Sequence, residues 1–339
     1  MDVRRRAIAL AIVISSVLLS SAIVLNACGD SGTSDSPSPS AVRPATLILD
    51  YLPGPVHAGV YYALEQGYYQ DEGIDLEIIP PTSTSDTLKL IAAGKAQFGI
   101  ADGIDVAGQI DQGQSAKGIM ALTQKPAGSV ITRVQDNIET PADLNGKTIG
   151  WSGVPSDKVA FEQIMKGGGG DPDSCKIVTI GYNGAQNLTS GKIAGFLGYA
   201  NADAVALDLD GVPTRSFMLD AYGGPQYPGL VVFSTEEAIA SEPELIQGFV
   251  TATIKGYEGV IQTPQAGIDA LLKYEPTIPA DFAEAGLDAT MPMFLGTAES
   301  YGVFQMENVA ELITWLTDGK LIETSFPPER YATNEFTEE

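Results

Sequence analysis

The spacing of apolar residues switches repeatedly along the chain between a two-residue period and a helical one, which predicts alternating strands and helices. The segment 74–79, IDLEII, alternates as a half-buried strand does. The segment 85–94, SDTLKLIAAG, has helical spacing, with Ser85 as N-cap and Gly94 as C-cap. Strands are expected at 46–51, 74–79, 96–102, 117–123, 128–132, 147–151, 176–180, 194–198, 214–218 and 230–234. Helices are expected at 57–66, 85–94, 103–112, 141–144, 157–166, 186–191, 201–208, 243–262, 265–274, 279–290 and 307–318.

This order of elements predicts an α/β fold with mostly parallel sheets. The number of strands indicates two sheets and therefore two lobes. Residues 46–132 and 230–339 are expected to form lobe 1, with strand 230–234 returning to its sheet, and residues 133–229 are expected to form lobe 2. Because the chain crosses twice between the lobes, a cleft should lie between them, which is the expected place for a small ligand.

The first 45 residues differ from the rest and predict export and tethering. Three arginines at positions 4–6 precede an apolar stretch at 7–25, as in an export signal. These nineteen residues, all apolar or Ser, could also cross a bilayer as an uncleaved helix, so both interpretations stay open on composition alone. Residues 29–44 are rich in Gly, Ser, Pro and Asp and are typical of a flexible tether.

The composition excludes several classes of function. The chain has 43 acidic and 19 basic residues, with a formal charge of −24, which argues against a nucleic-acid partner. One histidine, His57, and two cysteines, Cys28 and Cys175, leave no room for a multi-histidine metal site, a disulfide scaffold or a cysteine-built zinc site. Any Ser-His-Asp triad would have to use His57 as its base. We therefore expect no cofactor and no metal, and we expect Cys175 to be an inert, packed thiol.

Candidate ligand-binding residues follow strand ends, where α/β sheets bind ligands beside helix N-termini. Asp50 and Tyr51 end one strand and His57 opens the next helix, and Trp151, Ser152 and Ser156 repeat this arrangement in lobe 2. The two turns are expected to face each other across the cleft. The candidate set is Asp50, Tyr51, His57, Trp151, Ser152, Ser156, Tyr182, Asn183, Tyr199, Asn201, Asp203 and Tyr227.

The chemistry of this set suits a flat ligand. Tyr and Trp offer rigid stacking faces with a hydrogen-bonding tip. Asp50, Asn183 and Asp203 can accept hydrogen bonds from ring N–H or hydroxyl groups. Alternatives remain open for several members: a cap or surface role for His57, core packing for Tyr51 and Trp151, and a solvated helix position for Asp203. The glycine- and proline-rich segment 222–229 is expected to be a hinge, with Tyr227 as a candidate lid.

The tetrad at 25–28, Leu-Asn-Ala-Cys, resembles a bacterial lipobox. The resemblance implies that a signal peptide, residues 1–27, is cut off and that Cys28 carries a lipid through its thiol, with residues 28–45 as the tether. Loss of three arginines and one aspartate with the signal changes the formal charge from −24 to −26. The domain would then be anchored on the extracytoplasmic face of the cell membrane.

Three longer motifs, at 49–78, 139–165 and 171–203, resemble in the same order the substrate-binding proteins of ABC importers that are related to thiamine-pyrimidine synthesis proteins. The resemblance covers about residues 46 to 320. It implies a two-lobed type II periplasmic-binding-protein fold that closes on its ligand like a clam shell. It also implies a monomer that delivers its ligand to a permease and its ATPase. Some relatives are enzymes that use a histidine and a cysteine-rich motif, and this sequence has only the matching His57, so we expect no enzymatic activity.

Departures from the family pattern bear on the ligand. Tyr51, Gly54, Ala200 and Asp203 stand where the pyrimidine-binding relatives carry Trp, Asn, Trp and Glu, and all four changes remove volume. If Ala200 lines the cleft, the ligand should be larger than one pyrimidine ring. Because the family includes riboflavin binders, riboflavin is the expected ligand. The alternatives are a thiamine pyrimidine precursor (formylaminopyrimidine or hydroxymethylpyrimidine) and another small solute, such as a sulfonate, nitrate or a different aromatic molecule.

Overall fold

The structure is a computed structural model, and it describes residues 42–83 and 85–337. The predicted signal peptide, Cys28 and most of the predicted tether lie outside the described residues. Within those that it describes, every helix is too short or too polar to cross a membrane.

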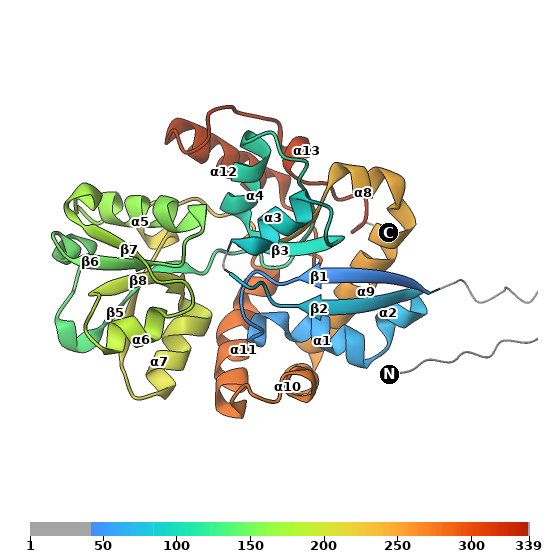
Figure 1. The fold of residues 1–339 in the computed structure, drawn as a ribbon, viewed down its shortest axis with the longest axis horizontal. Helices are drawn as coiled ribbons and strands as arrows, with labels where there is room; N and C mark the ends of the chain where they lie inside the picture. Colours follow the sequence, from blue (N-terminus) through green and yellow to red (C-terminus); the bar gives the residue numbers. More distant parts are fainter. Residues whose placement is uncertain (1–41, 84, 338–339) are drawn as a thin grey trace, which may run out of the picture. The chain divides into compact units, whose positions relative to one another are not determined.

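Two five-stranded sheets form the centres of two lobes (Figure 1). The first sheet has the order β2-β1-β3-β10-β4, in which β1 runs parallel to β2 and β3, and β10 runs antiparallel to β3 and β4. Every residue of β10, LVVFS, is buried, which explains its continuous apolar character. The strands of the first sheet are β1 (Arg43–Ile48), β2 (Ile74–Ile79), β3 (Phe98–Asp102), β4 (Lys117–Ala121) and β10 (Leu230–Ser234).

The second sheet repeats this plan with the order β7-β6-β8-β5-β9. Here β6 is parallel to β7 and β8, and β5 is antiparallel to β8 and β9. Its strands are β5 (Gly128–Arg133), β6 (Thr148–Trp151), β7 (Lys176–Thr179), β8 (Gly195–Tyr199) and β9 (Thr214–Met218). Its helices are α5 (Pro155–Gly167), α6 (Gly184–Thr189) and α7 (Val205–Leu209), and a π-helical turn (Ala200–Ala204) precedes α7.

The remaining helices surround the first sheet. They are α1 (Ala58–Glu65), α2 (Tyr68–Asp71), α3 (Asp86–Ala92), α4 (Gly103–Asp111), α8 (Glu236–Ser241), α9 (Pro243–Gln262), α10 (Pro264–Tyr274), α11 (Ala280–Leu295), α12 (Met306–Asp318) and α13 (Pro328–Tyr331). Glycines allow α1 and α9 to pack closely, because a Cβ on Gly59 would lie 2.3 Å from the Tyr257 ring and one on Gly256 would lie 2.2 Å from the Gly59 carbonyl oxygen. This contact fixes the start of α1, next to the cleft.

The α/β class and the two sheets are confirmed, but two details of the prediction are wrong. The sheets are not mostly parallel, since each has two parallel and two antiparallel strand pairs. The antiparallel pairs arise because β5 and β10, the strands that follow the two crossings between lobes, each run opposite to both neighbours. The strand expected at 128–132 in lobe 1 is β5 of the second sheet, so the chain crosses before residue 128.

The boundaries of the predicted elements are close to the observed ones, with informative exceptions. β1 ends at Ile48, so Asp50 and Tyr51 lie in the loop after the strand. Helix α11 continues to Leu295 past Pro292, where the prediction stopped at residue 290. The short helices α2, α8 and α13 were not predicted.

Candidate ligand-binding site

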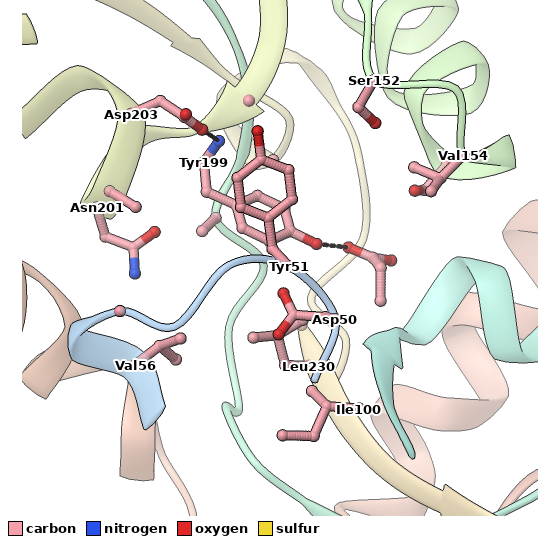
Figure 2. A pocket seen from close by; sticks show the side chains of 18 of the residues that line it. Asp50, Tyr51, Val56, Ile100, Ser152, Val154, Tyr199, Asn201, Asp203 and Leu230 are labelled. Carbon is pink, nitrogen blue, oxygen red and sulfur yellow. Dashed lines mark hydrogen bonds between the residues drawn. The ribbon is translucent and has the colours of Figure 1, made fainter. Parts of the chain in front are cut away.

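A cavity of about 310 Å³ lies between the lobes, where strands of both sheets end (Figure 2). Its volume is at the lower end of the range of roughly 300–1,000 Å³ seen for small-molecule sites. Apolar side chains contributed by both lobes line much of it. They include Leu52, Val56, Ile100, Val154, Leu230, Phe282 and Met293.

Asp50 and His57 form a fixed pair on the lobe 1 side of the cavity. His57 Nε2 lies 2.8 Å from Asp50 Oδ1, and the backbone N–H of Gly54 donates to His57 Nδ1 at 3.1 Å. Because Nδ1 accepts a hydrogen bond, the ring proton is on Nε2 and is donated to Asp50. His57 is only 1% exposed, so its part in the site is to orient Asp50.

Tyr51 projects into the middle of the cavity, between Asp50 and Asp203 in Figure 2. Tyr182 packs edge-on against it, with ring centroids 4.6 Å apart and an interplanar angle of 74°. The Tyr182 hydroxyl donates to the carbonyl of Pro81 at 3.0 Å, which holds that ring in place. Burial, with the nearby carboxylates, raises the pKa of Tyr51, so its hydroxyl keeps its proton at neutral pH.

The π-helical turn after β8 presents two acceptors from lobe 2, Asn201 and Asp203. The backbone N–H of Tyr199 donates to Asp203 Oδ2 at 2.8 Å, and burial raises the pKa of Asp203 to about 6. Asn201 Nδ2 donates to Thr290 Oγ1 at 2.7 Å. Asn201 Oδ1 is buried without a partner among the described residues, so it is available as an acceptor for a ligand.

A further buried aspartate, Asp102, lies on the floor of the cavity and was not predicted. It is the N-cap of α4, where its Oδ1 accepts from the Ile104 N–H at 2.9 Å. Its carboxylate also accepts from the hydroxyls of Tyr199, at 3.3 Å, and Tyr227, at 3.4 Å. Burial, together with repulsion from Asp105, raises the pKa of Asp102.

Two more unpredicted aspartates, Asp105 and Asp157, occupy the donors at the start of α5. Asp157 Oδ2 accepts from the Ser152 hydroxyl at 2.8 Å and from the Gly153 N–H at 3.0 Å. Asp105, on α4 of lobe 1, accepts from both the N–H and the hydroxyl of Ser156, each at 2.8 Å. Burial raises the pKa of Asp105 to about 7 and that of Asp157 to about 6.

The cavity is therefore strongly acidic. Five aspartates line it, and none of the described residues that line it is a lysine or arginine. Clusters of His, Cys, Asp and Glu that could hold a metal ion are absent from the described part of the chain. The polar groups left for a ligand are mainly acceptors, so the arrangement favours a molecule with N–H or O–H donors, or a cation, over an anion.

Hydrogen bonds join the two lobes around the cavity, so the structure is a closed form. One buried apolar cluster also continues across the boundary, with Ile104 and Ala107 of α4 beside Ala160 and Phe161 of α5. The bonds between the lobes are Asp105 with Ser156, Asp102 with Tyr199, Pro81 with Tyr182, Thr290 with Asn201, and Gln163 with Trp315.

The structure brings nine of the twelve predicted site residues to the cavity and leaves three outside its lining. Those that line it are Asp50, Tyr51, His57, Ser152, Ser156, Tyr199, Asn201, Asp203 and Tyr227. Tyr182 supports Tyr51, Trp151 packs edge-on against Phe161 with centroids 6.4 Å apart, and Asn183 Nδ2 donates to the Ile180 carbonyl at 3.2 Å. Contact of any of the twelve with a ligand stays a prediction.

Two other details differ from the sequence analysis. Tyr227 is only 1% exposed and its hydroxyl bonds Asp102, so it forms a wall of the cavity and not a lid. Ala200 does not line the cavity; its backbone N–H donates to the carbonyl of Ala127 instead. Because Ala200 lies outside the lining, its small side chain does not enlarge the cavity and does not favour riboflavin over a smaller ligand.

Two α/β lobes that close on a lined cavity define the fold of the periplasmic binding proteins. The alkanesulfonate-binding protein SsuA from Xanthomonas axonopodis pv. citri, solved with MOPS, is 13% identical, with a TM-score of 0.69 over 86% of this chain and 98% of that one. The CA3427 product of Candida albicans, described as having the generic periplasmic binding protein fold, is 12% identical, with a TM-score of 0.64 over 86% and 96%. Residues 54–267 match the family described as NMT1/THI5 like, and the chain belongs to this family.

Relatives within reach of sequence comparison include binding proteins and enzymes. The formylaminopyrimidine-binding protein of Halalkalibacterium halodurans is 26% identical over 304 residues, covering 88% of this chain and 91% of that one. The riboflavin-binding protein RibY of Chloroflexus aurantiacus is 26% identical over 293 residues, covering 84% and 81%. A 4-amino-5-hydroxymethyl-2-methylpyrimidine phosphate synthase of Legionella pneumophila is 26% identical over 259 residues, covering 74% and 80%.

Proposed function

We propose that this protein is the extracytoplasmic solute-binding component of an ABC importer, and that it captures a flat nitrogen heterocycle rich in N–H donors. The observation that carries the proposal is the set of five aspartates around Tyr51, with no basic side chain among the described residues of the lining. The closed two-lobed form supports capture and release, and a permease with its ATPase is the partner that such a protein serves.

Within this class we favour a thiamine-type aminopyrimidine, such as formylaminopyrimidine or 4-amino-5-hydroxymethyl-2-methylpyrimidine. An aminopyrimidine places an amino group beside a ring nitrogen, and a carboxylate such as Asp203 or Asp50 can accept from the amino group with a charge-assisted bond. The Tyr51 ring offers a stacking face for the heterocycle. A cavity of about 310 Å³ and the formylaminopyrimidine-binding relative both support a small ligand.

Riboflavin is the second candidate, and the relative RibY is the observation in its favour. Its ring N–H and ribityl hydroxyls are also donors that suit an acceptor-rich cavity. It ranks lower than in the sequence analysis because Ala200, the position expected to enlarge the cleft, lies outside the lining.

Sulfonate and nitrate are disfavoured by the state of the α5 N-terminus. Anions bind helix N-termini through backbone N–H groups. In this chain the N–H groups of Gly153 and Ser156 already donate to Asp157 and Asp105. An anion would therefore have to displace a carboxylate and approach four others.

The contacts of His57 favour a ligand-binding protein over a synthase. Both ring nitrogens of His57 are engaged, Nε2 with Asp50 and Nδ1 with the Gly54 N–H. A histidine held in this way has no lone pair left for a metal or a proton transfer. We retain the proposal that Cys28 carries a lipid. The predicted tether, residues 28–45, overlaps β1 at residues 43–45, so we propose that only residues 28–42 tether a monomeric domain outside the cell.

A panel of ligands tests the proposal. The processed protein, purified from membranes in detergent, is titrated with 4-amino-5-hydroxymethyl-2-methylpyrimidine, riboflavin and methanesulfonate while thermal unfolding and flavin fluorescence are followed. We expect the aminopyrimidine to raise Tm at micromolar concentration and methanesulfonate to have no effect. Quenching by riboflavin with no response to the pyrimidine would transfer the proposal to the flavin, and a response to methanesulfonate alone would overturn the ligand class.

A further inference from the structure

The contact between Asp105 and Ser156 connects the lobes in an unusual chemical way. Asp105 belongs to α4 of lobe 1, whereas Ser156 is in the first turn of α5 in lobe 2. Both carboxylate oxygens are used, one for the Ser156 N–H and one for its hydroxyl, each at 2.8 Å. Both residues are buried, with exposures of 4% and 8%. A side chain of one lobe thus caps a helix of the other.

The cap is placed where an anionic group of a solute would otherwise bind. Val154 is the N-cap of α5 and its side chain makes no capping bond, so the helix has no local acceptor for the Ser156 N–H. Ser156 and Asp105 both line the cavity, so this pair lies at the edge of the space where a ligand would bind. The thirteen-residue helix α5 adds the positive end of its dipole at the same point.

We propose that Asp105 is a built-in anion that determines specificity: it satisfies the α5 N-terminus from the opposite lobe, which holds the cleft closed and excludes anionic solutes. The inference rests on the proposed function as a solute-binding protein, but it does not depend on which heterocycle is bound. An open form would leave the Ser156 N–H to water, so formation of the two bonds favours closure.

Substitutions at this contact test separately whether it excludes anionic solutes and whether it holds the cleft closed. Asp105→Ala frees both Ser156 donors and removes one negative charge, so methanesulfonate should bind at least about tenfold more tightly than to the unmodified protein. Asp288→Asn is the matched control, because Asp288 is an exposed aspartate of α11. Ser156→Ala removes the hydroxyl bond and should loosen closure, and its control is Ser190→Ala on the exposed end of α6.

Closure can be followed with tryptophan emission. The chain has two tryptophans, and Trp315 Nε1 donates across the lobes to Gln163 Oε1 at 3.3 Å. In the full chain carrying Trp151→Phe, the emission of Trp315 therefore reports contact between the lobes. We expect a red shift for Asp105→Ala and Ser156→Ala in the absence of ligand, and none for the two controls.

The outcomes are distinct from those that test the proposed function, because neither measurement uses a pyrimidine or a flavin. Saturable methanesulfonate binding by Asp105→Ala, absent from the unmodified protein, supports the inference even if the aminopyrimidine fails to bind. The inference is overturned if Asp105→Ala and the unmodified protein bind methanesulfonate with equal affinity. It is also overturned if Trp315 emission is unchanged in both Asp105→Ala and Ser156→Ala. If Asp105→Ala does not fold, as judged by loss of its circular dichroism signal, Ser156→Ala provides the test instead. Trp315 emission of Ser156→Ala equal to that of the control Ser190→Ala would then overturn the inference.

Discussion

Replacement of Asp203 by asparagine should make the protein more stable and a poorer binder at the same time. Asparagine keeps the size of the side chain and an oxygen that can accept from the Tyr199 N–H, a bond of 2.8 Å in the structure. It removes the charge, and it turns one ligand-facing acceptor into an N–H₂ donor.

The magnitudes follow from the environment of Asp203. Burial raises its pKa from 3.8 to about 6. A shift of this size corresponds to a cost of ionisation of about 3 kcal/mol at pH 8, where the folded protein must hold the carboxylate charged. Relief of that cost should raise the free energy of unfolding by up to this amount. A lost charge-assisted hydrogen bond weakens binding by about 1.5–3 kcal/mol, or roughly 10- to 150-fold.

Urea denaturation of the ligand-free protein at pH 8 and pH 5, together with calorimetric titration of the aminopyrimidine, measures both effects. The gain in stability should be largest at pH 8 and fall to about half of that at pH 5, where the folded carboxyl of Asp203 is mostly protonated but the unfolded one is still ionised. The exposed Asp288→Asn should change neither quantity by more than about 0.5 kcal/mol. A loss of stability at pH 8, or an affinity equal to that of the unmodified protein, would refute the reasoning.

Three further predictions use other parts of the site and fold. In urea denaturation of the ligand-free protein, the free energy of unfolding should fall by a few kcal/mol as the pH rises from about 4 to 8. The reason is that the raised pKa values of Asp105 and Asp157 make the folded protein bind more protons than the unfolded chain in that range. A free energy of unfolding that rises with pH would contradict this. Tyr51→Ala should weaken ligand binding about tenfold or more in calorimetry through loss of a stacking face, whereas Tyr51→Phe should stay within a few-fold, and equal affinities of the two variants would exclude stacking. Gly59→Ala should lower the free energy of unfolding by about 1–3 kcal/mol in urea, because its Cβ would meet the Tyr257 ring; an unchanged midpoint would show that α1 and α9 can separate freely.

The loop after each strand was the most predictable part of the site. Asp50, Tyr51 and Ser152 were selected because strand ends in α/β sheets gather at one edge, and all three line the cavity. Trp151 was selected by the same reasoning and does not line it. Trp151 is the last residue of β6 and packs against Phe161 in its own lobe, whereas Ser152, the first residue after the strand, lines the cavity.

The buried aspartates of the cavity differ in how far the sequence could predict them. Asp102 closes the segment AQFGIAD and is followed by a helix, so the reasoning that selected Asp50 could have found it. Asp105 and Asp157 lie inside helices, where carboxylates usually face solvent. The approach of α4 to α5 across the lobes brings Asp105 against Ser156, and the order of residues along one chain does not reveal that contact.

The strand β5 shows a similar limit in the fold. Its five buried or half-buried apolar and hydroxyl residues suit a central strand of either sheet, so its local pattern could not tell which lobe it joins. The pairing with β8 and β9 is decided by where the chain crosses, and that crossing carries no distinct sequence signal.

The most direct test of the central claim is calorimetric titration of the purified protein with 4-amino-5-hydroxymethyl-2-methylpyrimidine and, in parallel, with methanesulfonate at pH 7.5. An acidic cavity built from five aspartates around Tyr51 predicts one-site binding of the pyrimidine with micromolar or tighter affinity and no heat from methanesulfonate. Binding of methanesulfonate in place of the pyrimidine would contradict the account.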